Sequence, residues 1–436
     1  MNSKPYPKYK PSGVEWLGDV PEHWEVKRLK YCAPLVTTKA GNSGSNPIAL
    51  ENIESWTGRF IETESEFEGE GIRFQKDDVL FGKLRPYLAK VYLAETNGES
   101  VGDIFVLRPA EETTSKYLSN ALRTNNYIEI IDGSTYGSKM PRASWEFMGC
   151  LPFLLPPLPE QQAIAAFLDR ETGRIDALIA KKERLLELLA EQRTALISCV
   201  VTGKIDITTK EMNHGNHGRH GKGEKENFRE FSAFRGYKKY KPSGVEWLGD
   251  VPEHWGVKAL RYICRIETGD KDTVDAEDDG EYPFYVRSQT VERINSFTKN
   301  CEAVLTAGDG VGVGKVFHYY TGKFDFHQRV YLFSHFKKIT GRFFFLFLKE
   351  NFWRVALEGG AKSTVDSLRR PMIASFPFAI PPLPEQHAIA AYLDRETAKI
   401  DTLSAKVTTV IERLKEYRTA LISSAVTGKI DVREAV

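Results

Sequence analysis

The stretch AGDGVGVGKV at 307–316 comes closest to a phosphate-binding loop. A P-loop needs G-x-x-x-x-G-K followed by Ser or Thr, so that backbone amides cradle the phosphates and the hydroxyl binds magnesium. Asp309 stands where the first glycine is required, and Val316 replaces the hydroxyl. The stretch therefore predicts a glycine-rich turn, not a nucleotide site.

Three histidines, His214, His217 and His220, lie three residues apart among glycines, but no nearby cysteine or carboxylate completes a zinc ligand set. The chain also lacks the H-E-x-x-H, G-x-S-x-G and G-x-G-x-x-G motifs, and the N/D-P-P-aromatic tetrapeptide of amino-methyltransferases. We therefore expect no catalytic residue, no bound metal and no cofactor held by this chain. The sequence favours a recognition protein.

Composition narrows the class further. The formal net charge is only +1 over 436 residues, so any nucleic-acid surface must be a local patch. The run FFFLFL at 343–348 is too short to cross a bilayer, and no secretory signal is apparent, so no membrane partner is expected. An odd number of cysteines without a CxxC pair favours reduced thiols and a cytoplasmic location; they are Cys32, Cys150, Cys199, Cys264 and Cys301.

Basic, aromatic and hydrogen-bonding residues gather in turn-like stretches of two regions. Lysine and arginine contact phosphates, polar side chains read base edges, and glycines let the backbone approach closely. The acidic runs at 62–70 and 270–281 should then face away from DNA. The candidate DNA-binding residues are Lys83, Arg85, Tyr87, Lys90, Tyr136, Ser138, Lys139 and Arg142 in the first region, and Gly310, Gly312, Lys315, His327, Gln328, Arg329, Lys362, Ser363, Arg369 and Arg370 in the second.

A repeated frame surrounds these regions. YKPSGVEWLGDVPEHW at 9–24 returns unchanged at 240–255, and PPLPEQQAIAAFLDRET at 156–172 returns as PPLPEQHAIAAYLDRET at 381–397. RTALISCVVTGKID at 193–206 returns as RTALISSAVTGKID at 418–431. Repetition at this long period indicates a duplicated domain, not a solenoid. The repeated phrases are nearly unchanged, whereas the regions that they enclose differ. Duplication followed by sequence drift alone would have changed both, so drift alone is a poor explanation of this pattern.

The enclosed regions, roughly 25–155 and 256–380, hardly resemble each other, yet their patterns agree. DVLFGKLRPYLAKVYL at 78–93 aligns with AVLTAGDGVGVGKVFH at 303–318, and each is typical of a strand, a turn and a strand. DIFVLRP and RVYLFSH predict further strands, and KYLSNALRTNNYIEII and GRFFFLFLKENFWRVAL predict helices. We therefore expect one α+β fold that carries two different surfaces.

The rest of the frame predicts two long helices. Pro159, followed by Glu160, is typical of a helix start, and Gly203 of a helix end. Heptad spacing between them predicts that the two helices pair as an antiparallel coiled coil, related by a pseudo-twofold axis. Polar Glu171, Lys182 and Gln192 interrupt the first seam. The predicted seam residues are Leu168, Ile175, Leu178, Leu185, Leu189 and Leu196, with Leu393, Ile400, Leu403, Val407, Val410, Leu414 and Leu421 in the second copy.

The frame phrases, present twice around dissimilar regions, resemble the specificity subunit of type I restriction–modification systems over nearly the whole chain. The resemblance implies two target-recognition domains that read a bipartite asymmetric site on double-stranded DNA, and two conserved spacer helices. It also implies two methyltransferase subunits that use S-adenosylmethionine, and restriction subunits that use ATP and Mg²⁺, with no active centre here. The polar, glycine-rich stretch between the halves does not resemble the family's frame.

The predicted division is therefore 1–155 for the first frame segment and target-recognition domain, 156–206 for the first spacer helix, 207–239 for a flexible linker, 240–380 for the second frame segment and domain, and 381–436 for the second spacer helix. Two alternatives remain open. One is a specificity subunit of a methylation-only or differently cleaving system. The other, from a different class, is a coiled-coil scaffold with two protein-binding domains.

Overall fold

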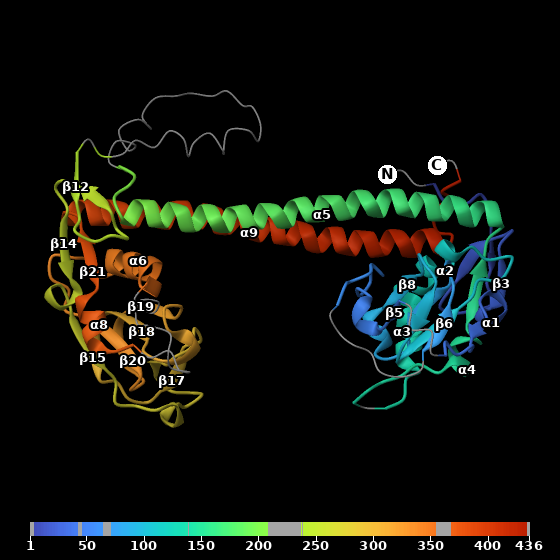
Figure 1. Ribbon diagram of the computed structural model, residues 1–436, viewed down its shortest axis with the longest axis horizontal. Coiled ribbons are helices and arrows are strands. Elements are labelled where there is room, and N and C mark those ends of the chain that lie inside the picture. The colour runs from blue at the N-terminus through green and yellow to red at the C-terminus, as the bar shows by residue number, and fades with distance from the viewer. Residues whose placement is uncertain are drawn as a thin grey trace. The chain divides into compact units, whose positions relative to one another are not determined.

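The computed structural model describes residues 4–41, 46–63, 71–137, 139–207, 237, 239–354 and 368–433. The chain forms two compact units (Figure 1). Unit 1 comprises residues 1–184 and 407–436, and unit 2 comprises residues 185–406. Each unit therefore combines one of the two dissimilar regions with parts of both long helices. The His-rich stretch lies outside the described residues, as does nearly all of the predicted linker.

Unit 1 contains mixed helix and sheet. Its elements before the long helix are β1 (Tyr9–Pro11), β2 (Asp19–Pro21), β3 (Glu25–Arg28), α1 (Leu29–Cys32), β4 (Leu35–Val36), β5 (Pro47–Ile48), η1 (Leu50–Asn52), β6 (Ile72–Phe74), β7 (Val79–Gly82), η2 (Pro86–Leu88), β8 (Val91–Leu93), β9 (Gly98–Ser100), β10 (Ile104–Leu107), α2 (Ser115–Leu122), α3 (Asn125–Gly133), α4 (Trp145–Met148) and β11 (Pro152–Leu155).

Unit 2 has the same general composition with longer strands. Its elements are β12 (Tyr240–Pro242), β13 (Asp250–Pro252), β14 (Gly256–Ala259), η4 (Leu260–Tyr262), β15 (Arg265–Thr268), η5 (Thr273–Asp275), β16 (Tyr282–Tyr285), β17 (Glu292–Ile294), β18 (Lys299–Ala307), η6 (Gly310–Gly312), β19 (Phe317–Phe326), β20 (Val330–Ser334), α6 (Gly341–Asn351), α8 (Arg370–Ser375) and β21 (Pro377–Ile380).

The two units share one sheet order, which confirms the expectation of one α+β fold with two surfaces. Unit 1 has a four-stranded sheet in the order β4-β10-β7-β8, and unit 2 repeats it as β15-β20-β18-β19 before adding β16 and β17. The small pairs β1-β2 and β11-β3 recur as β12-β13 and β14-β21. The aligned stretches form β7-η2-β8 and β18-η6-β19, as predicted. The stretch predicted as one helix at 116–131 instead forms most of α2 and α3.

The frame helices are α5 (Leu158–Val201) and α9 (Leu383–Val426), each of 44 residues. Each corresponds to about 66 Å of helix at 1.5 Å per residue. Gly203 and Gly428 follow the helix ends with φ angles of 75° and 71°, the left-handed conformation that glycine adopts at helix C-termini. Among the described residues, no helix is long and apolar enough to cross a membrane.

The two helices run antiparallel, as an ion pair in each unit indicates. In unit 1, Arg418 of α9 binds Asp176 of α5, with Nε 2.9 Å from Oδ1. In unit 2, Arg193 of α5 binds Asp401 of α9, with Nε 3.0 Å from Oδ1. The two pairs occupy equivalent positions of the repeat with the helices exchanged. This exchange agrees with the predicted pseudo-twofold relation of the helix pair.

The predicted seam is partly wrong. Leu168, Ile175, Leu189 and Leu196 are buried, as are Leu393, Val407 and Leu421, whereas Leu178, Leu403 and Val410 are each about 40% exposed. Ile179 and Ile411 are buried instead. Both helices carry two apolar stripes at heptad spacing, and only one can face the partner helix. The remaining predicted members, Leu185, Ile400 and Leu414, are half-buried.

The repeated PEQ sequence attaches each domain to its helix. In unit 1, the buried Glu160 carboxylate accepts hydrogen bonds from the Tyr6 hydroxyl at 2.5 Å and the Trp24 indole at 3.0 Å, and it lies 2.7 Å from His23 Nε2. Burial, together with this carboxylate, raises the pKa of Tyr6. Gln161 accepts from the Thr114 amide at 2.8 Å, at the start of α2. Glu160 thus attaches the frame segment to α5, and Gln161 attaches the domain that contains α2.

Unit 2 repeats this attachment. His254 and Trp255 reach Glu385 at 2.8 and 3.1 Å, Tyr237 donates to the same carboxylate, and Gln386 accepts from the Thr340 amide at 2.8 Å. The equivalent contacts explain why these frame residues recur around dissimilar domains.

The frame segment of each copy packs against the helix of the other copy. In unit 1, Tyr9 donates to the Gly428 carbonyl at 3.0 Å, and a Cβ at Gly428 would collide with Pro21 and Trp24. In unit 2, Tyr240 donates to the Gly203 carbonyl at 3.1 Å. The frame segment of each half therefore packs against the end of the long helix that belongs to the other half.

Candidate nucleic-acid interface

Three segments meet at the turn after β7 in unit 1. Lys83 donates its amide to the Asp103 carbonyl at 2.9 Å, just before β10, and its own carbonyl accepts from the Ala143 amide at 2.8 Å. The Arg85 amide donates to the Pro141 carbonyl at 2.8 Å. The two stretches that the sequence predicted, 83–87 and 136–142, are thus brought together as neighbouring segments.

This surface presents exposed aromatic and basic side chains. Arg85 is exposed and has a φ of 52°, a left-handed conformation that is uncommon for a residue other than glycine. Tyr87 and Tyr136 are 46% and 62% exposed, and Lys139 is also exposed. Backbone strain of this kind gathers at functional sites. The turn thus presents Arg85 and Tyr87 outward at the cost of an unfavourable backbone angle.

A carboxylate holds two of the cations in place. Arg142 donates hydrogen bonds to the Asp103 carboxylate, with Nη2 2.9 Å from Oδ2 and Nε 3.1 Å from Oδ1. Lys83 Nζ lies 3.6 Å from Oδ1 of the same carboxylate. The hydrogen bonds from Arg142 lower the pKa of Asp103, so the carboxylate stays charged at neutral pH. Asp103 thus fixes the directions of one cation from each adjoining segment.

Unit 2 builds the same meeting of segments. The Gly308 amide donates to the Arg329 carbonyl at 2.8 Å, and the Gly308 carbonyl accepts from the Leu368 amide at 2.8 Å. These two bonds are equivalent to those of Lys83 in unit 1. The candidate residues around 308–316, 327–329 and 368–370 therefore converge on one surface, as those of the first domain do.

Compared with unit 1, the signs of the charges on these two segments are reversed in unit 2. In unit 2 the carboxylate is Asp309, in the turn after β18, and one cation is Arg329, just before β20. Arg329 Nη1 lies 2.6 Å from Oδ2, and Arg287 Nη1 lies 3.1 Å from Oδ1. Burial would raise the pKa of Asp309, but the two guanidinium groups outweigh it and lower the pKa. The same scaffold thus displays a different charge pattern.

The glycine-rich loop forms an open tip. Gly310 has a φ of 71° with no atom within 4 Å of a built Cβ, Val311 is 93% exposed, and Lys315 is exposed. A strand, β19, follows the loop, whereas a P-loop leads into a helix whose N-terminus faces the phosphates. The loop therefore does not have the strand–loop–helix arrangement of a P-loop.

Several predicted contact residues lie elsewhere or point inward. Lys90 donates to the Leu50 carbonyl at 2.6 Å, and burial lowers its pKa. His327 is only 2% exposed, and its Nδ1 accepts from the Arg329 amide at 2.9 Å, so it supports the surface without lying on it. Ser138, Lys362 and Ser363 lie outside the described residues. Arg369 is exposed, and Arg370 donates to the Ile266 carbonyl at 3.1 Å.

The acidic run at 270–281 does not point wholly away from the candidate surface. Asp272 accepts from Gln328 at 2.5 Å and lies 3.5 Å from His327 Nε2. The backbone of Lys271 forms an isolated parallel β-bridge with His327, which places this acidic segment beside the candidate surface, and its orientation relative to DNA stays a prediction. For the run at 62–70, only residues 62 and 63 are described, so its orientation stays a prediction.

Asp103, Asp309 and Arg287 were not predicted as members of these surfaces. Asp103 and Arg287 lie outside the basic stretches, and Asp309 was considered only as a position of the P-loop motif. Asp103 directly precedes the predicted strand DIFVLRP, opposite the turn after β7. Pairing that strand with the preceding one would have placed the carboxylate beside Lys83, so the signal was present but needed the sheet order.

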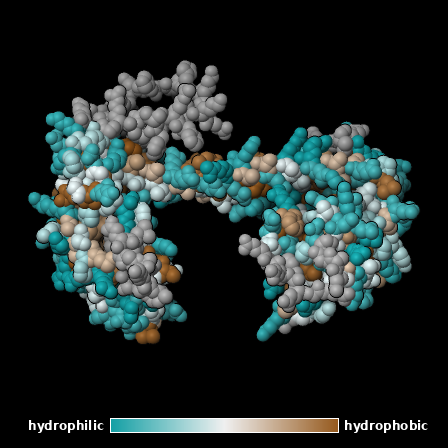
Figure 2. Space-filling view, in the orientation of Figure 1, coloured by the Kyte–Doolittle hydropathy of each residue, from teal (hydrophilic) through white to brown (hydrophobic). Residues whose placement is uncertain are grey.

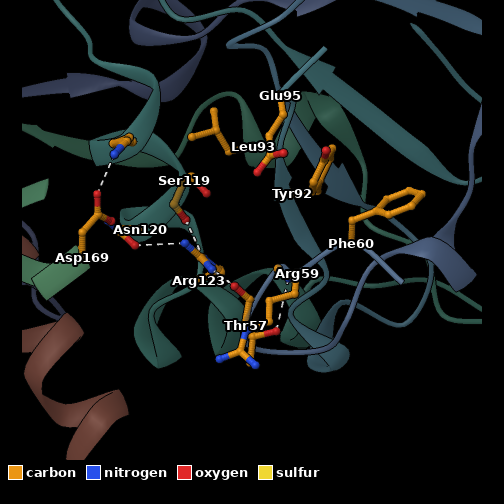
Figure 3. A pocket seen from close by; sticks show the side chains of 12 residues that line it. Thr57, Arg59, Phe60, Tyr92, Leu93, Glu95, Ser119, Asn120, Arg123 and Asp169 are labelled. Atoms are coloured by element: carbon orange, nitrogen blue, oxygen red, sulfur yellow. Dashed lines mark hydrogen bonds and ion pairs between the residues drawn. The ribbon is translucent and has the colours of Figure 1, made fainter. Parts of the chain in front are cut away.

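A hollow of about 230 Å³ lies elsewhere in unit 1 (Figure 3). The cations at its wall already have partners. Arg123 donates to the Asn120 side chain at 3.0 Å and to the Thr57 carbonyl, and burial lowers its pKa to about 10. Lys116 binds Asp169 at 2.6 Å, a contact that recurs in unit 2 as Arg342 with Asp394. The hollow therefore marks the junction of domain and helix.

No group of three or more metal-binding side chains occurs among the described residues. All five cysteines are free thiols, and Cys150 is exposed.

Comparison with known proteins places these features in context. Residues 21–188 and 252–413 match the model of the type I restriction modification DNA specificity domain. The type I restriction enzyme EcoDI specificity subunit of Escherichia coli is 32% identical over 182 residues, which are 42% of this chain and 40% of that protein. The match thus spans about two fifths of that relative's length.

Two solved structures resemble the whole chain. One is a chain from work on complex assembly and conformational transition of the type I R-M system, with 17% identity, a TM-score of 0.67, and coverage of 94% of this chain and 99% of that one. The other is the HsdS subunit of Thermoanaerobacter tengcongensis, with 16% identity, a TM-score of 0.51, and coverage of 94% and 98%. At these identities the likeness concerns the fold.

Proposed function

Because its two halves match the family model over most of the chain, the protein belongs to the type I restriction modification DNA specificity family, and we propose that it reads a two-part asymmetric site on double-stranded DNA. In this proposal each unit reads one half-site. The observation that carries it is the repeated meeting of three segments, which is built by equivalent hydrogen bonds but bears exchanged charges in the two units.

Within each surface the roles divide by chemistry. Exposed lysine and arginine, such as Lys139 and Lys315, are placed to bind phosphates, which sets the register on the duplex. Arg142 and Arg329 are held by carboxylates, and a fixed guanidinium can discriminate guanine from other bases. The open tip at Gly310 lets the backbone approach a phosphate closely. Differences between the two surfaces account for an asymmetric site.

The helix pair supports a second part of the proposal, the docking of partner subunits. Leu403, Val410 and Tyr417 recur every seven residues along α9 and are 40%, 40% and 48% exposed. Leu178 of α5, equivalent to Leu403, is 41% exposed. Figure 2 shows apolar residues at the surface along these helices. An apolar heptad stripe on a charged helix is typical of contact with another helix.

We assign this role to two methyltransferase subunits, one for each half of the repeat, with restriction subunits joining them. Catalysis, S-adenosylmethionine, ATP and Mg²⁺ then belong to these partners, and the present chain supplies recognition. No residue constellation for covalent chemistry was found in the sequence, which agrees with this division of labour.

Selection from random-sequence duplexes tests the proposal. The chain, purified together with the methyltransferase that this proposal assigns to it, should enrich duplexes that share two short motifs separated by a fixed gap. Enrichment of a single continuous motif would contradict the two-head account. No enrichment at all, with the methyltransferase bound, would instead favour a protein-binding scaffold.

A further inference from the structure

An exposed tyrosine occurs at the same place in both halves. Tyr31 is 64% exposed and Tyr262 is 61% exposed. They are separated by the same offset as the repeated phrase at 9–24 and 240–255, and the preceding residues agree as K-R-L-K-Y and K-A-L-R-Y. The frame repeat thus extends into the edge of each target-recognition domain.

The local structure holds these tyrosines outward. In unit 1, Leu29 is fully buried and donates its amide to the Leu151 carbonyl at 2.9 Å, and the Lys30 amide donates to the Gly149 carbonyl at 2.9 Å. In unit 2, Leu260 is fully buried and donates to the Phe376 carbonyl at 3.0 Å. A buried leucine two positions earlier therefore anchors each short helix, so the exposure of the tyrosine belongs to the fold.

Each tyrosine carries a cation on its ring. Lys30 Nζ lies 5.3 Å from the ring centroid of Tyr31, and the Arg261 guanidinium lies 4.9 Å from that of Tyr262. Apolar side chains lie on the neighbouring short helices: Phe147 of α4 is 40% exposed, and Met372 of α8 is half-buried. Two units whose candidate DNA surfaces differ thus share an aromatic, basic and apolar patch.

A feature common to both halves indicates a partner common to both. We propose that Tyr31 with Lys30, and Tyr262 with Arg261, are equivalent contact points for the two methyltransferase subunits, one on each domain. This inference rests on the proposed function and adds a second contact to the docking stripe of the helices. The matching surface of the methyltransferase should be an apolar depression edged by carboxylates.

The chemistry favours a protein over the DNA backbone. Phosphate contacts need cations and hydrogen-bond donors, whereas a largely exposed aromatic ring contributes most when a protein surface buries it. Tyrosine and arginine are also the residues that most often dominate protein interfaces. Since the cation already lies over the ring, it can meet a carboxylate while the ring covers apolar surface.

The test uses the full chain and the purified methyltransferase without DNA. Tyr31→Ala should weaken one of the two methyltransferase sites by about tenfold or more, as expected for an interface hot spot, and Tyr262→Ala should weaken the other. At about three times the parent dissociation constant, sedimentation should then show about 1.5 bound copies for the parent chain and about 1.0 for each single variant. The double variant should bind only about 0.5 copy at that concentration.

The matched control is Phe297→Ala. Phe297 is 43% exposed and carries Lys323 Nζ 4.6 Å from its ring centroid, and this pair has no counterpart among the residues of unit 1 that the structure describes. It should leave both methyltransferase sites unchanged. Thermal melting of each variant separates loss of binding from loss of folding, and Tyr31→Phe should keep most of the affinity because the ring remains.

Two results would overturn the inference alone. One is unchanged methyltransferase affinity in the double variant while the parent binds two copies. The other is unchanged methyltransferase affinity combined with weaker binding to a duplex of random sequence, which would assign the patch to DNA phosphates. A parent chain that binds no methyltransferase would overturn the proposed partner, and this inference with it.

Discussion

Replacing Asp103 by asparagine should separate charge from shape at the first reading surface. The amide keeps the size of the carboxylate but no longer neutralises Arg142 and Lys83, which lie 2.9 and 3.6 Å from its oxygens. Two opposite effects on DNA binding follow. The surface gains one net positive charge, while Arg142 loses the partner that fixes its direction.

The structure sets the size of both effects. The side chains of Asp103 and Arg142 are 21% and 35% exposed, so solvent weakens the ion pair and its loss should cost little folding stability. A unit charge about 8 Å from a phosphate, in a dielectric close to that of water, contributes about 0.5 kcal/mol. Binding to random duplexes should thus tighten about twofold, and its salt dependence should steepen by up to about 0.9 in slope. Loss of a fixed base contact should reduce discrimination at the first half-site by about 1–3 kcal/mol.

Fluorescence anisotropy with specific and scrambled duplexes, measured over a range of salt with the methyltransferase bound, would report all three quantities. The control is Asp78→Asn in the same unit, where Arg108 binds a carboxylate that is only 3% exposed, with Nε 2.9 Å from Oδ1. That variant should lose more stability without changing discrimination. If Asp103→Asn changes neither the salt slope nor discrimination, the surface does not face DNA.

Four further outcomes are expected. Asp309→Asn should reduce discrimination at the second half-site only, in the same duplex assay, and an effect on the first half-site would contradict independent reading. Burial raises the pKa of Glu350 to about 7, so its folded form holds a proton more tightly than the unfolded chain, and unit 2 should lose stability as pH rises from about 4.5 to 7. The loss of stability amounts to about 1 kcal/mol after allowance for solvent screening, and Glu350→Gln should remove it. Chemical denaturation of the parent and the variant at pH 5 and pH 8 would measure the difference. Equal pH dependence of stability in the two proteins would refute this role of Glu350. Inserting one heptad after Lys182 and another after Val407 lengthens each helix by about 10 Å and should add about three base pairs between the half-sites, and an unchanged gap would refute the helices as a ruler. Leu403→Asp should weaken methyltransferase binding in sedimentation, whereas Lys415→Gln, which also changes the net charge by one negative unit at an exposed position of the same helix, should not.

The repeat and the helix ends could be predicted because they depend on local signals. Identical phrases, a proline followed by glutamate at the helix start, and glycine after the helix end are all visible in a single sequence. The aligned hairpins β7-β8 and β18-β19 were predicted on the same basis. The resemblance to a known family then supplied the arrangement into two recognition domains.

The seam could not be fully predicted because α5 and α9 each carry two apolar stripes. Leu178 and Ile179 are neighbours in sequence and almost equally apolar, yet only Ile179 is buried. The choice depends on the register and rotation of the other helix, which heptad counting does not provide. Only the exposed members of the predicted seam, Leu178, Leu403 and Val410, are instead available to a partner.

The stretches that form the candidate interface were predicted from their composition, but some of their residues were misassigned and others were overlooked. His327 was chosen for its neighbours Gln328 and Arg329, but it is buried beneath them because the backbone turns at the start of β20. Asp103 was missed because its partner Arg142 is distant in sequence. Tyr31 and Tyr262 were also missed, although continuing the repeat a few residues past Trp24 and Trp255 would have found them.

Mapping methylated bases in a host that expresses the chain with the proposed methyltransferase tests the central claim most directly. The account predicts one bipartite asymmetric motif with a fixed gap, in which Asp103→Asn relaxes the first half alone and Asp309→Asn the second half alone. A continuous or palindromic motif from the intact chain, or relaxation of both halves by either substitution, would contradict the claim that two similar domains read two different half-sites.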